Sequence, residues 1–272
     1  MTTELLSLPT DQWTKTRENF AGYVRLVAAI RRALVDPHPL WWHASLQVTH
    51  GGLTTGPIDV DGTEVVLKFL MRTHQLIIKG ADHRIPIEGQ GLTGFRDEVL
   101  ETLAGVGVKP DIDLDQFTGA RRKTYDGDAV EHFHTALRFF NGIFEDFARE
   151  QRGETSPVQF WPHHLDLAVT WFTGRTVDGV DPADEENARE QMTFGFSPGG
   201  DLGTKAPYIY AYAYPSPEGL IAQPIPAGGK WLDGKWTGAI MSYETIAEAV
   251  EPRITTLRFL RSVQAAAAEL IG

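Results

Sequence analysis

A repeated heptapeptide is the feature of this sequence that most constrains how the chain can fold. The segments 43–49 (HASLQVT) and 164–170 (HLDLAVT) are identical at their first, fourth, sixth and seventh positions. Both alternate polar and apolar residues, a pattern typical of β-strands that bury one face. The residues expected to face the core are Leu46, Val48, Leu167 and Val169.

The opposite face of each expected strand is polar and forms a candidate binding surface. It carries His43, Ser45, Gln47 and Thr49 in the first copy, and His164, Asp166, Ala168 and Thr170 in the second. If the two copies are related by a pseudo-two-fold axis, His43 and His164 would lie near it. Their imidazole, carboxylate and hydroxyl groups could then hold a small polar ligand. The expected ligand-binding residues are His43, Ser45, Gln47, His164, Asp166 and Thr170, with Trp42, Trp161 and Tyr212 beside them. The alternative interpretation is that these residues are simply the solvated face of an antiparallel sheet.

Hydrophobic periodicity predicts the same order of elements around both copies. Apolar residues at helical spacing predict helices over 19–34, 94–104, 128–148 and 243–270. Runs of strand-forming residues occupy 65–71, 75–79, 83–87, 192–196 and 207–214. Asp61-Gly62 is typical of a tight hairpin, and Thr93 and Asp128 are the expected helix caps. Each half therefore consists of a helix, the strand expected over its copy of the heptapeptide, further strands and a closing helix.

This order predicts an α+β fold with mostly antiparallel strands. We expect one domain over 1–272, built from two duplicated halves, about 13–110 and 124–272, with pseudo-two-fold symmetry. Residues 5–13 are expected to be an irregular lead-in, and 111–127 a polar linker with one short edge strand. The acidic stretch 178–190 is expected to be a loop or a short surface helix.

Composition excludes several classes of function. A net charge of −11 argues against a nucleic-acid-binding surface, which needs clustered Lys and Arg. The absence of cysteine excludes disulfides, thiolate catalysis and Cys-based zinc or iron–sulfur sites. The N-terminus does not resemble a signal peptide, and no apolar run is long enough to cross a bilayer. We therefore expect a cytoplasmic protein that binds neither nucleic acid nor membranes.

The histidine pairs predict no metal site by spacing alone. His163 and His164 are adjacent, and adjacent side chains of a strand point to opposite faces. His132 and His134 are two residues apart on an expected helix, where they also point in different directions. A pairing of His164 with Asp166 stays open as a metal ligand pair or a general base.

Three short motifs resemble known sites but lack a necessary residue. The motif 195–199 (GFSPG) matches a nucleophile elbow, but Pro198 has no amide proton for an oxyanion hole. The motif 89–94 (GQGLTG) matches a dinucleotide-binding loop without a βαβ unit, so we interpret it as a glycine-rich helix entry. Residues 111–115 (DIDLD) resemble the start of a calcium loop but lack its glycine and glutamate, which favours a solvated strand face. The sequence identifies no cofactor.

Four tyrosines alternate along one expected strand. Tyr208, Tyr210, Tyr212 and Tyr214 share one side, with Ile209, Ala211 and Ala213 on the other. Such a stripe could stack a ring-shaped ligand or form a contact with a second chain, although more often it packs within the protein. The small alanines on the reverse side would let a helix approach closely, which favours tyrosines that face outward or into a cleft.

Several segments together resemble a bacterial family described only as a domain of unknown function. The segments are 41–43 (WWH), 52–55 (GLTT), 156–158 (SPV), 166–170 (DLAVT), 195–200 (GFSPGG) and 212–219 (YAYPSPEG). They extend over nearly the whole chain, so the resemblance implies a single full-length domain. It implies no activity, cofactor or catalytic residue.

Three hypotheses of function follow from these patterns. The first is binding of a small polar ligand in a cleft between the two halves. The second is a metal-assisted hydrolase or isomerase that uses His164 and Asp166. The third is an interaction protein in which the tyrosine stripe forms a homodimer contact.

Overall fold

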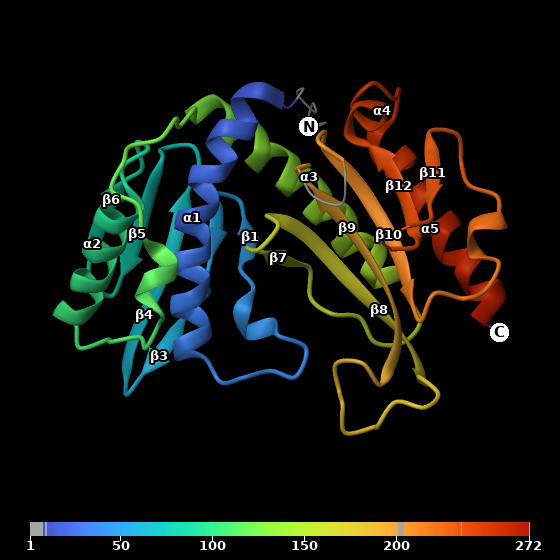
Figure 1. Cartoon of the computed structure of the whole chain (residues 1–272), viewed down its shortest axis with the longest axis horizontal. Coiled ribbons are helices and arrows are strands. Elements are labelled where there is room, and N and C mark those ends of the chain that lie inside the picture. Colours follow the sequence, from blue (N-terminus) through green and yellow to red (C-terminus); the bar gives the residue numbers. More distant parts are fainter. Residues whose placement is uncertain (1–7, 9, 201–203, 235, 272) are drawn as a thin grey trace. The chain divides into compact units, whose positions relative to one another are not determined.

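The computed structural model describes residues 8, 10–200, 204–234 and 236–271 (Figure 1). The chain divides into two compact units. Unit 2 contains Leu8–Arg138 and Phe160–Leu165, and unit 1 contains Phe139–Gln159 and the chain from Asp166 onward. The division falls inside a helix, α3 (Gly127–Glu150), whose first half belongs to unit 2 and whose second half belongs to unit 1.

Unit 2 is an antiparallel sheet covered by two helices. Its sheet has the order β1-β2-β4-β5-β6, with β3 paired to β4. The strands are β1 (Gln47–Thr49), β2 (Gly52–Thr54), β3 (Ile58–Val60), β4 (Thr63–Leu70), β5 (Gln75–Lys79) and β6 (His83–Pro86). The helical segments are α1 (Thr10–Leu34), η1 (Trp42–Ala44), α2 (Leu92–Gly105), η2 (Leu114–Phe117) and the start of α3.

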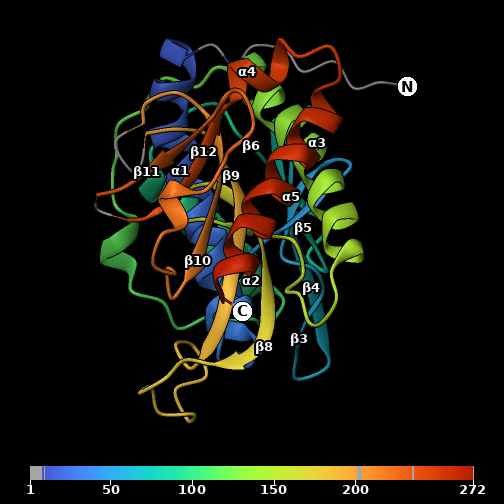
Figure 2. The same cartoon turned by 90° about the vertical axis from the view of Figure 1, so that its right-hand side faces the viewer.

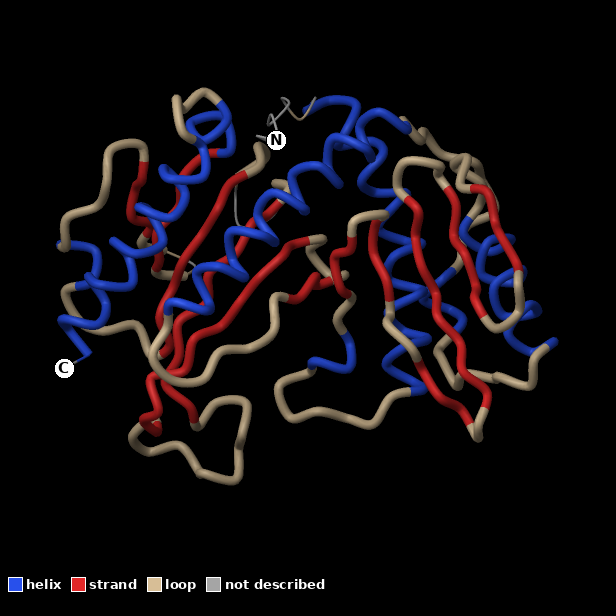
Figure 3. Tube along the Cα trace, turned by 180° about the vertical axis from the view of Figure 1, so that it is seen from behind, coloured by secondary structure: helices blue, strands red, loops and turns tan. Residues whose placement is uncertain are grey.

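Alternating apolar residues bind the sheet of unit 2 to its helices. Val65, Leu67 and Phe69 point to the buried face of β4. Phe20 of α1 meets Phe69 edge-on at 5.7 Å between ring centroids. The ring centroids of Tyr23 on α1 and Phe95 on α2 are 4.4 Å apart, and this ring contact joins the two helices. Figure 1 shows α1 and α2 on one face of this sheet, and Figure 3 shows the sheet from its other side.

Unit 1 contains a second antiparallel sheet, with the order β11-β12-β10-β9-β8-β7. The strands are β7 (Gln159–Trp161), which begins in this unit, β8 (Asp166–Thr176), β9 (Arg189–Ser197), β10 (Tyr208–Tyr214), β11 (Gly229–Leu232) and β12 (Gly238–Ser242). The helical segments are η3 (Leu220–Ala222), α4 (Tyr243–Ala247), α5 (Pro252–Ile271) and the second half of α3.

Aromatic packing joins α3 to the sheet of unit 1. Phe140 stacks on Phe196 of β9 with ring centroids 4.4 Å apart, and Phe147 meets Phe194 edge-on at 4.7 Å. Helix α5 covers the same sheet and is buried at Phe259 and its neighbours. Figure 2 shows α3 and α5 lying over this sheet. Burial of these large aromatic rings contributes to the hydrophobic stabilisation of this unit.

The predicted fold class is confirmed, since the described residues form five helices and two antiparallel sheets. The predicted strands over 65–71, 75–79, 83–87, 192–196 and 207–214 all exist within one to three residues of their bounds. The Asp61-Gly62 hairpin joins β3 to β4, with both residues at positive φ as a tight turn requires. None of the helices in the described part of the chain combines the length and apolar character needed to span a membrane.

Several predicted boundaries were wrong. Helix α1 begins at Thr10 and includes Trp13, so 10–13 of the expected lead-in are helical, whereas Leu8 is irregular as predicted; residues 1–7 and 9 lie outside the described residues. Asp126, and not Asp128, caps α3 by accepting a hydrogen bond from the Ala129 amide at 3.0 Å. Gly91 precedes α2 as its N-cap, and the Thr93 hydroxyl instead accepts a bond from the Gly119 amide.

Two expected elements also differ in kind. The segment 111–126 contains the 3₁₀ turn η2 and no strand, because Asp113 accepts bonds from the Asp115 amide and the Gln116 side chain. The closing helix over 243–270 is interrupted between Ala247 and Pro252.

The two heptapeptides are not equivalent strands, so this prediction was wrong. In the first copy, His43 and Ala44 lie in η1, and the strand begins only at Gln47. In the second copy, His164 lies in a turn, and Leu165 has a φ of 58°, which is incompatible with an extended strand. Strand β8 begins at Asp166. The internal duplication and its symmetry stay a prediction.

Phe140→Ala tests the aromatic packing of unit 1. The Phe140 side chain is fully buried against Phe196, so its loss leaves a cavity and should lower the free energy of unfolding by about 3–5 kcal/mol. Urea unfolding followed by circular dichroism measures this change. Phe139→Ala, at the half-buried neighbouring position, is the matched control and should cost less than half as much. Equal losses for the two variants would contradict the described packing.

Candidate functional site

The residues predicted to bind a ligand are distributed over both units. Unit 2 contains Trp42, His43, Ser45, Gln47, Trp161 and His164. Unit 1 contains Asp166, Thr170 and Tyr212. Within each unit, the structure shows which of them lie together.

Trp42 and His43 lie in a compact aromatic turn of unit 2. The Trp42 ring stacks on His38 with centroids 4.1 Å apart, and the His43 ring stacks on Trp41 at 5.7 Å. The His43 Nδ1 atom accepts a hydrogen bond from the His38 amide at 3.0 Å. Burial lowers the pKa of His43, and the nearby Arg31, Arg32 and His38 lower it further. His43 is therefore held as a buried neutral imidazole in this turn.

Ser45 and Gln47 do not form one polar face with His43. Ser45 is buried, and its hydroxyl donates to the Trp42 carbonyl at 2.9 Å. Gln47 is exposed and begins β1. The hydroxyl bond of Ser45 stabilises the 3₁₀ turn in place of an extended strand, which is why the alternating pattern fails here.

His164 is an exposed residue in the turn that follows Trp161, the last residue of β7. The predicted geometry of His163 and His164 on opposite faces of a strand was therefore wrong, because both lie in this turn. The carbonyl groups of Pro162 and His163 are instead bound by the guanidinium of Arg25.

In unit 1, Asp166 forms a buried polar contact with the tyrosine stripe. Its carboxylate accepts a hydrogen bond from the Tyr210 hydroxyl. Burial raises the pKa of Tyr210 well above its ordinary value, and the negative charge of Asp166 raises it further. Tyr210 is therefore a neutral donor that fixes the position of the Asp166 carboxylate.

Thr170 and Tyr212 extend this polar face. The Thr170 hydroxyl lies 3.1 Å from that of Thr193 on the adjacent strand, and the rings of Tyr210 and Tyr212 stack at 6.2 Å. The tyrosines do share one side of β10, as predicted, but Tyr208 and Tyr210 are buried and only Tyr212 is substantially exposed, at 36%. Gly195 makes room for the Tyr210 ring, since a Cβ there would lie 2.3 Å from a ring atom.

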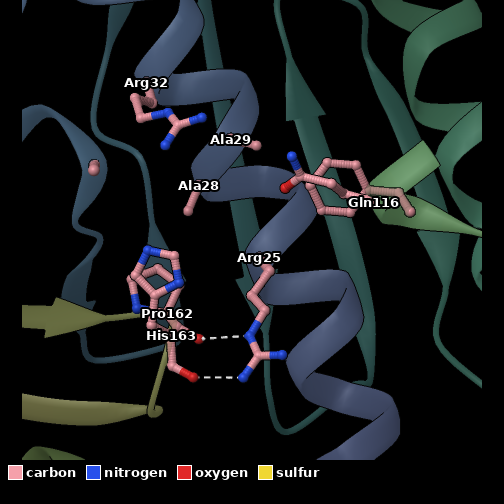
Figure 4. Close-up of a pocket in the computed structure, with 9 residues that line it drawn as sticks. Arg25, Ala28, Ala29, Arg32, Gln116, Pro162 and His163 are labelled. Carbon is pink, nitrogen blue, oxygen red and sulfur yellow. Dashed lines mark hydrogen bonds between the residues drawn. The ribbon is translucent and has the colours of Figure 1, made fainter. Parts of the chain in front are cut away.

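A separate cavity in unit 2 carries positive charge. It has a volume of about 280 Å³ and is lined by Arg25, Ala28, Ala29, Arg32, Ala44, Gln116, Phe117, Pro162 and His163. Figure 4 shows Arg25 and Arg32 at different heights along α1, with the two alanines between them and His163 across from the helix. None of these lining residues is acidic.

The two arginines of this cavity are not paired with carboxylates, and the neighbouring Asp113 carboxylate binds the Gln116 side chain. In the described part of the chain, neither Arg25 nor Arg32 forms an ion pair, and Arg32 makes no side-chain hydrogen bond. Burial lowers the pKa of His163, and so do the charges of Arg25, His164 and Arg32.

Sequence reasoning missed the residues of this cavity. Arg25 and Arg32 are seven residues apart, close to two helical turns, so they lie on one face of α1. Ala28 and Ala29 between them keep that face open. This pattern was visible in the sequence, but the contributions of Gln116 and His163 depend on tertiary contacts.

The described residues contain no group of three or more His, Asp or Glu that could hold a metal ion. His134 is instead a packing residue, because its Nε2 atom lies 3.1 Å from the Thr49 carbonyl and burial lowers its pKa to about 4.

Two short motifs of the sequence have structural roles. Ser197 of the GFSPG motif is buried, and its hydroxyl accepts a hydrogen bond from the Gly199 amide, so the motif forms a structural turn as expected. Gly89 fits closely against the Lys123 carbonyl, so the glycine-rich helix entry is also confirmed.

Comparison with known proteins identifies a family whose function is unknown. The model of a family of unknown function, DUF5996, matches residues 5–272. No curated protein and no solved structure matches the chain. The match extends over both units, and every argument about function has to come from the residues themselves.

Tyr210→Phe tests the contact with Asp166. Removal of the hydroxyl takes a donor away from a partly buried carboxylate, so the free energy of unfolding should fall by about 1–3 kcal/mol at pH 7. Tyr214→Phe, at the half-buried end of the same strand, is the control and should leave the free energy of unfolding nearly unchanged. Urea unfolding measures both changes, and a neutral effect of Tyr210→Phe would contradict the contact.

The same contact predicts a loss of stability in alkali. The pKa of Tyr210 is raised in the folded protein, so its contribution is complete below pH 10 and decreases as the pH rises above 10. Unfolding free energies of the wild type should therefore decrease above pH 10, and those of Tyr210→Phe should decrease less steeply. Parallel pH profiles for the two proteins would contradict the raised pKa.

Proposed function

Because the chain belongs to DUF5996, a family of unknown function, its activity must be inferred from its own residues, and we propose that unit 2 binds a small anionic ligand. The binding site is the cavity along α1. Its ligand carries a carboxylate, phosphate or sulfate group.

The observation that carries the proposal is a pair of arginines at a cavity without a compensating acid. The protein as a whole has a net charge of −11, yet the residues that line this cavity include two arginines, a histidine and no acid. An arginine that is left without a carboxylate in such a protein is available to a ligand.

The geometry of Arg25 supports a binding role. Its Nε and one terminal nitrogen donate to the carbonyls of Pro162 and His163, which fixes the guanidinium at the cavity. The remaining terminal nitrogen has no hydrogen-bond partner in the described part of the chain. Because the Arg25 guanidinium is already held in place and has one terminal nitrogen left to donate, it can bind an anion with little loss of side-chain entropy.

The cavity also has the size of a small-molecule site. Its volume of about 280 Å³ is close to the lower end of the range of about 300–1,000 Å³ typical of ligand pockets. Gln116 donates one amide hydrogen to Asp113, which leaves its second amide hydrogen for a ligand, and Phe117 supplies apolar area. This combination favours a compact organic anion.

The other hypotheses from the sequence stay proposals. A polar ligand between two duplicated halves would need His43, but His43 is engaged by the amide of His38. A metal-assisted hydrolase would use His164 and Asp166, and a homodimer would use Tyr212, the exposed member of its stripe. A cytoplasmic location is supported by the absence of cysteine.

Titration calorimetry with sulfate tests the anion site. The wild-type protein should bind sulfate, and Arg32→Gln should weaken binding about tenfold, since it removes one of the two arginine charges at the cavity. Arg32 is exposed and makes no side-chain hydrogen bond to the described residues, so the variant should retain its thermal stability. Arg258→Gln on α5 of unit 1 is the matched control and should leave the sulfate affinity unchanged. Absence of sulfate binding, or equal weakening by both variants, would refute the proposal.

The pH dependence of sulfate binding provides a second test. A bound anion stabilises the protonated form of His163, whose pKa is lowered in the free protein by burial and further by Arg25, His164 and Arg32. Sulfate affinity should therefore increase as the pH falls from 8 to 6, while the charge of sulfate itself is constant. His163→Gln should remove most of this dependence. An affinity that is independent of pH in the wild type would exclude His163 from the site.

A further inference from the structure

We infer that the ligand of the unit 2 cavity carries two anionic groups joined by a short apolar linker, as a small dicarboxylate does. This inference rests on the proposed anion site and adds the class of its ligand. The observation behind it is the arrangement of charged and apolar side chains along α1.

The two arginines are placed as separate anchors. Seven residues of α-helix place the backbones of Arg25 and Arg32 about 10 Å apart and about 20° apart around the axis. The Arg25 guanidinium is held by the carbonyls of Pro162 and His163, so it cannot fold back toward Arg32 without breaking both bonds. Figure 4 shows the two guanidinium groups at opposite ends of the row of labelled α1 residues.

The helix surface between the anchors is apolar. Ala28 and Ala29 lie on α1 between the two arginines. Ala44, Phe117 and Pro162 add further apolar surface to the lining, while Gln116 and His163 are its other polar residues. A single compact anion such as sulfate contacts one anchor and leaves the alanine surface unused. A molecule with a methylene linker buries that surface and contacts both guanidinium groups.

The alternative of one large multivalent anion fits less well. A polyphosphate has charged oxygens along its whole length, and these would lie against the alanines without donors. The Gln116 side chain already donates to the Asp113 carboxylate at 2.9 Å, and Phe117 beside it adds a ring rather than a charge. With an arginine at each end of the α1 row and two alanines between them, the lining matches a ligand that is charged at its two ends.

Calorimetric titration with propionate and with malonate, succinate, glutarate and adipate tests this inference at pH 7.5. One or two of the dicarboxylates should bind at least about tenfold more tightly than propionate, since a second charge-assisted contact is worth more than about 1.4 kcal/mol. The affinity should pass through a maximum with chain length, because only one length spans the two anchors.

Arg32→Gln separates two-point binding from general attraction. In this variant the ratio of the propionate dissociation constant to that of the best dicarboxylate should fall to about one, because the second anchor is lost. Arg258→Gln should leave the ratio unchanged. Thermal unfolding of both variants checks that each is folded.

The outcomes distinguish this inference from the proposed function. If neither sulfate nor any carboxylate binds, the anion site itself is refuted. If sulfate binds but propionate and all dicarboxylates have equal affinities, the anion site stands and the two-anchor inference is refuted. A dicarboxylate preference that persists unchanged in Arg32→Gln also refutes it, since Arg32 would then not be the second anchor.

Discussion

Hydrogen bonds from α1 arginines to backbone carbonyls determine the local structure on which the rest of unit 2 depends. Arg25 binds the carbonyls of Pro162 and His163, and Arg31 binds those of Trp42 at 2.8 Å and Thr55 at 2.9 Å. Each bond joins a charged donor to a neutral acceptor and contributes about 1.5–3 kcal/mol. These bonds hold the segments around His43 and His164 in turns, although both segments alternate polar and apolar residues as strands do.

This use of arginine also explains why unit 2 has a cationic cavity in an acidic protein. A carbonyl group accepts a hydrogen bond but does not neutralise the charge of its donor, so Arg25 stays a full cation after both bonds form. Arg32 adds a second charge on the same helix face, and the two arginines add to the effect of burial in lowering the pKa of His163. The structural role of Arg25 and its binding role are therefore compatible, because they use different donor atoms of one guanidinium.

Unit 1 combines burial and polarity in a different way. Its sheet packs Phe194 and Phe196 against α3 on one face, while the other face carries the Tyr210–Asp166 contact. The alternation of β10 predicted both faces, since successive side chains of a strand point to opposite faces. It did not predict that Tyr210 would be buried, because burial there depends on Gly195 of the neighbouring strand leaving room for the ring.

The sequence by itself determined the α+β class, the main helices, the strands named above and the hairpin at Asp61-Gly62, because periodicity and turn chemistry are local properties of a few consecutive residues. The tertiary structure decided the candidate site. His43 and His164 begin the same motif, but different distant residues fix the backbone beside them. Arg31 binds the Trp42 carbonyl next to His43. Arg25 binds the His163 carbonyl next to His164, and Leu165 has a positive φ. The cavity likewise joins residues from 25 to 163, and a set so distant along the chain is brought together only by packing, which no local pattern encodes.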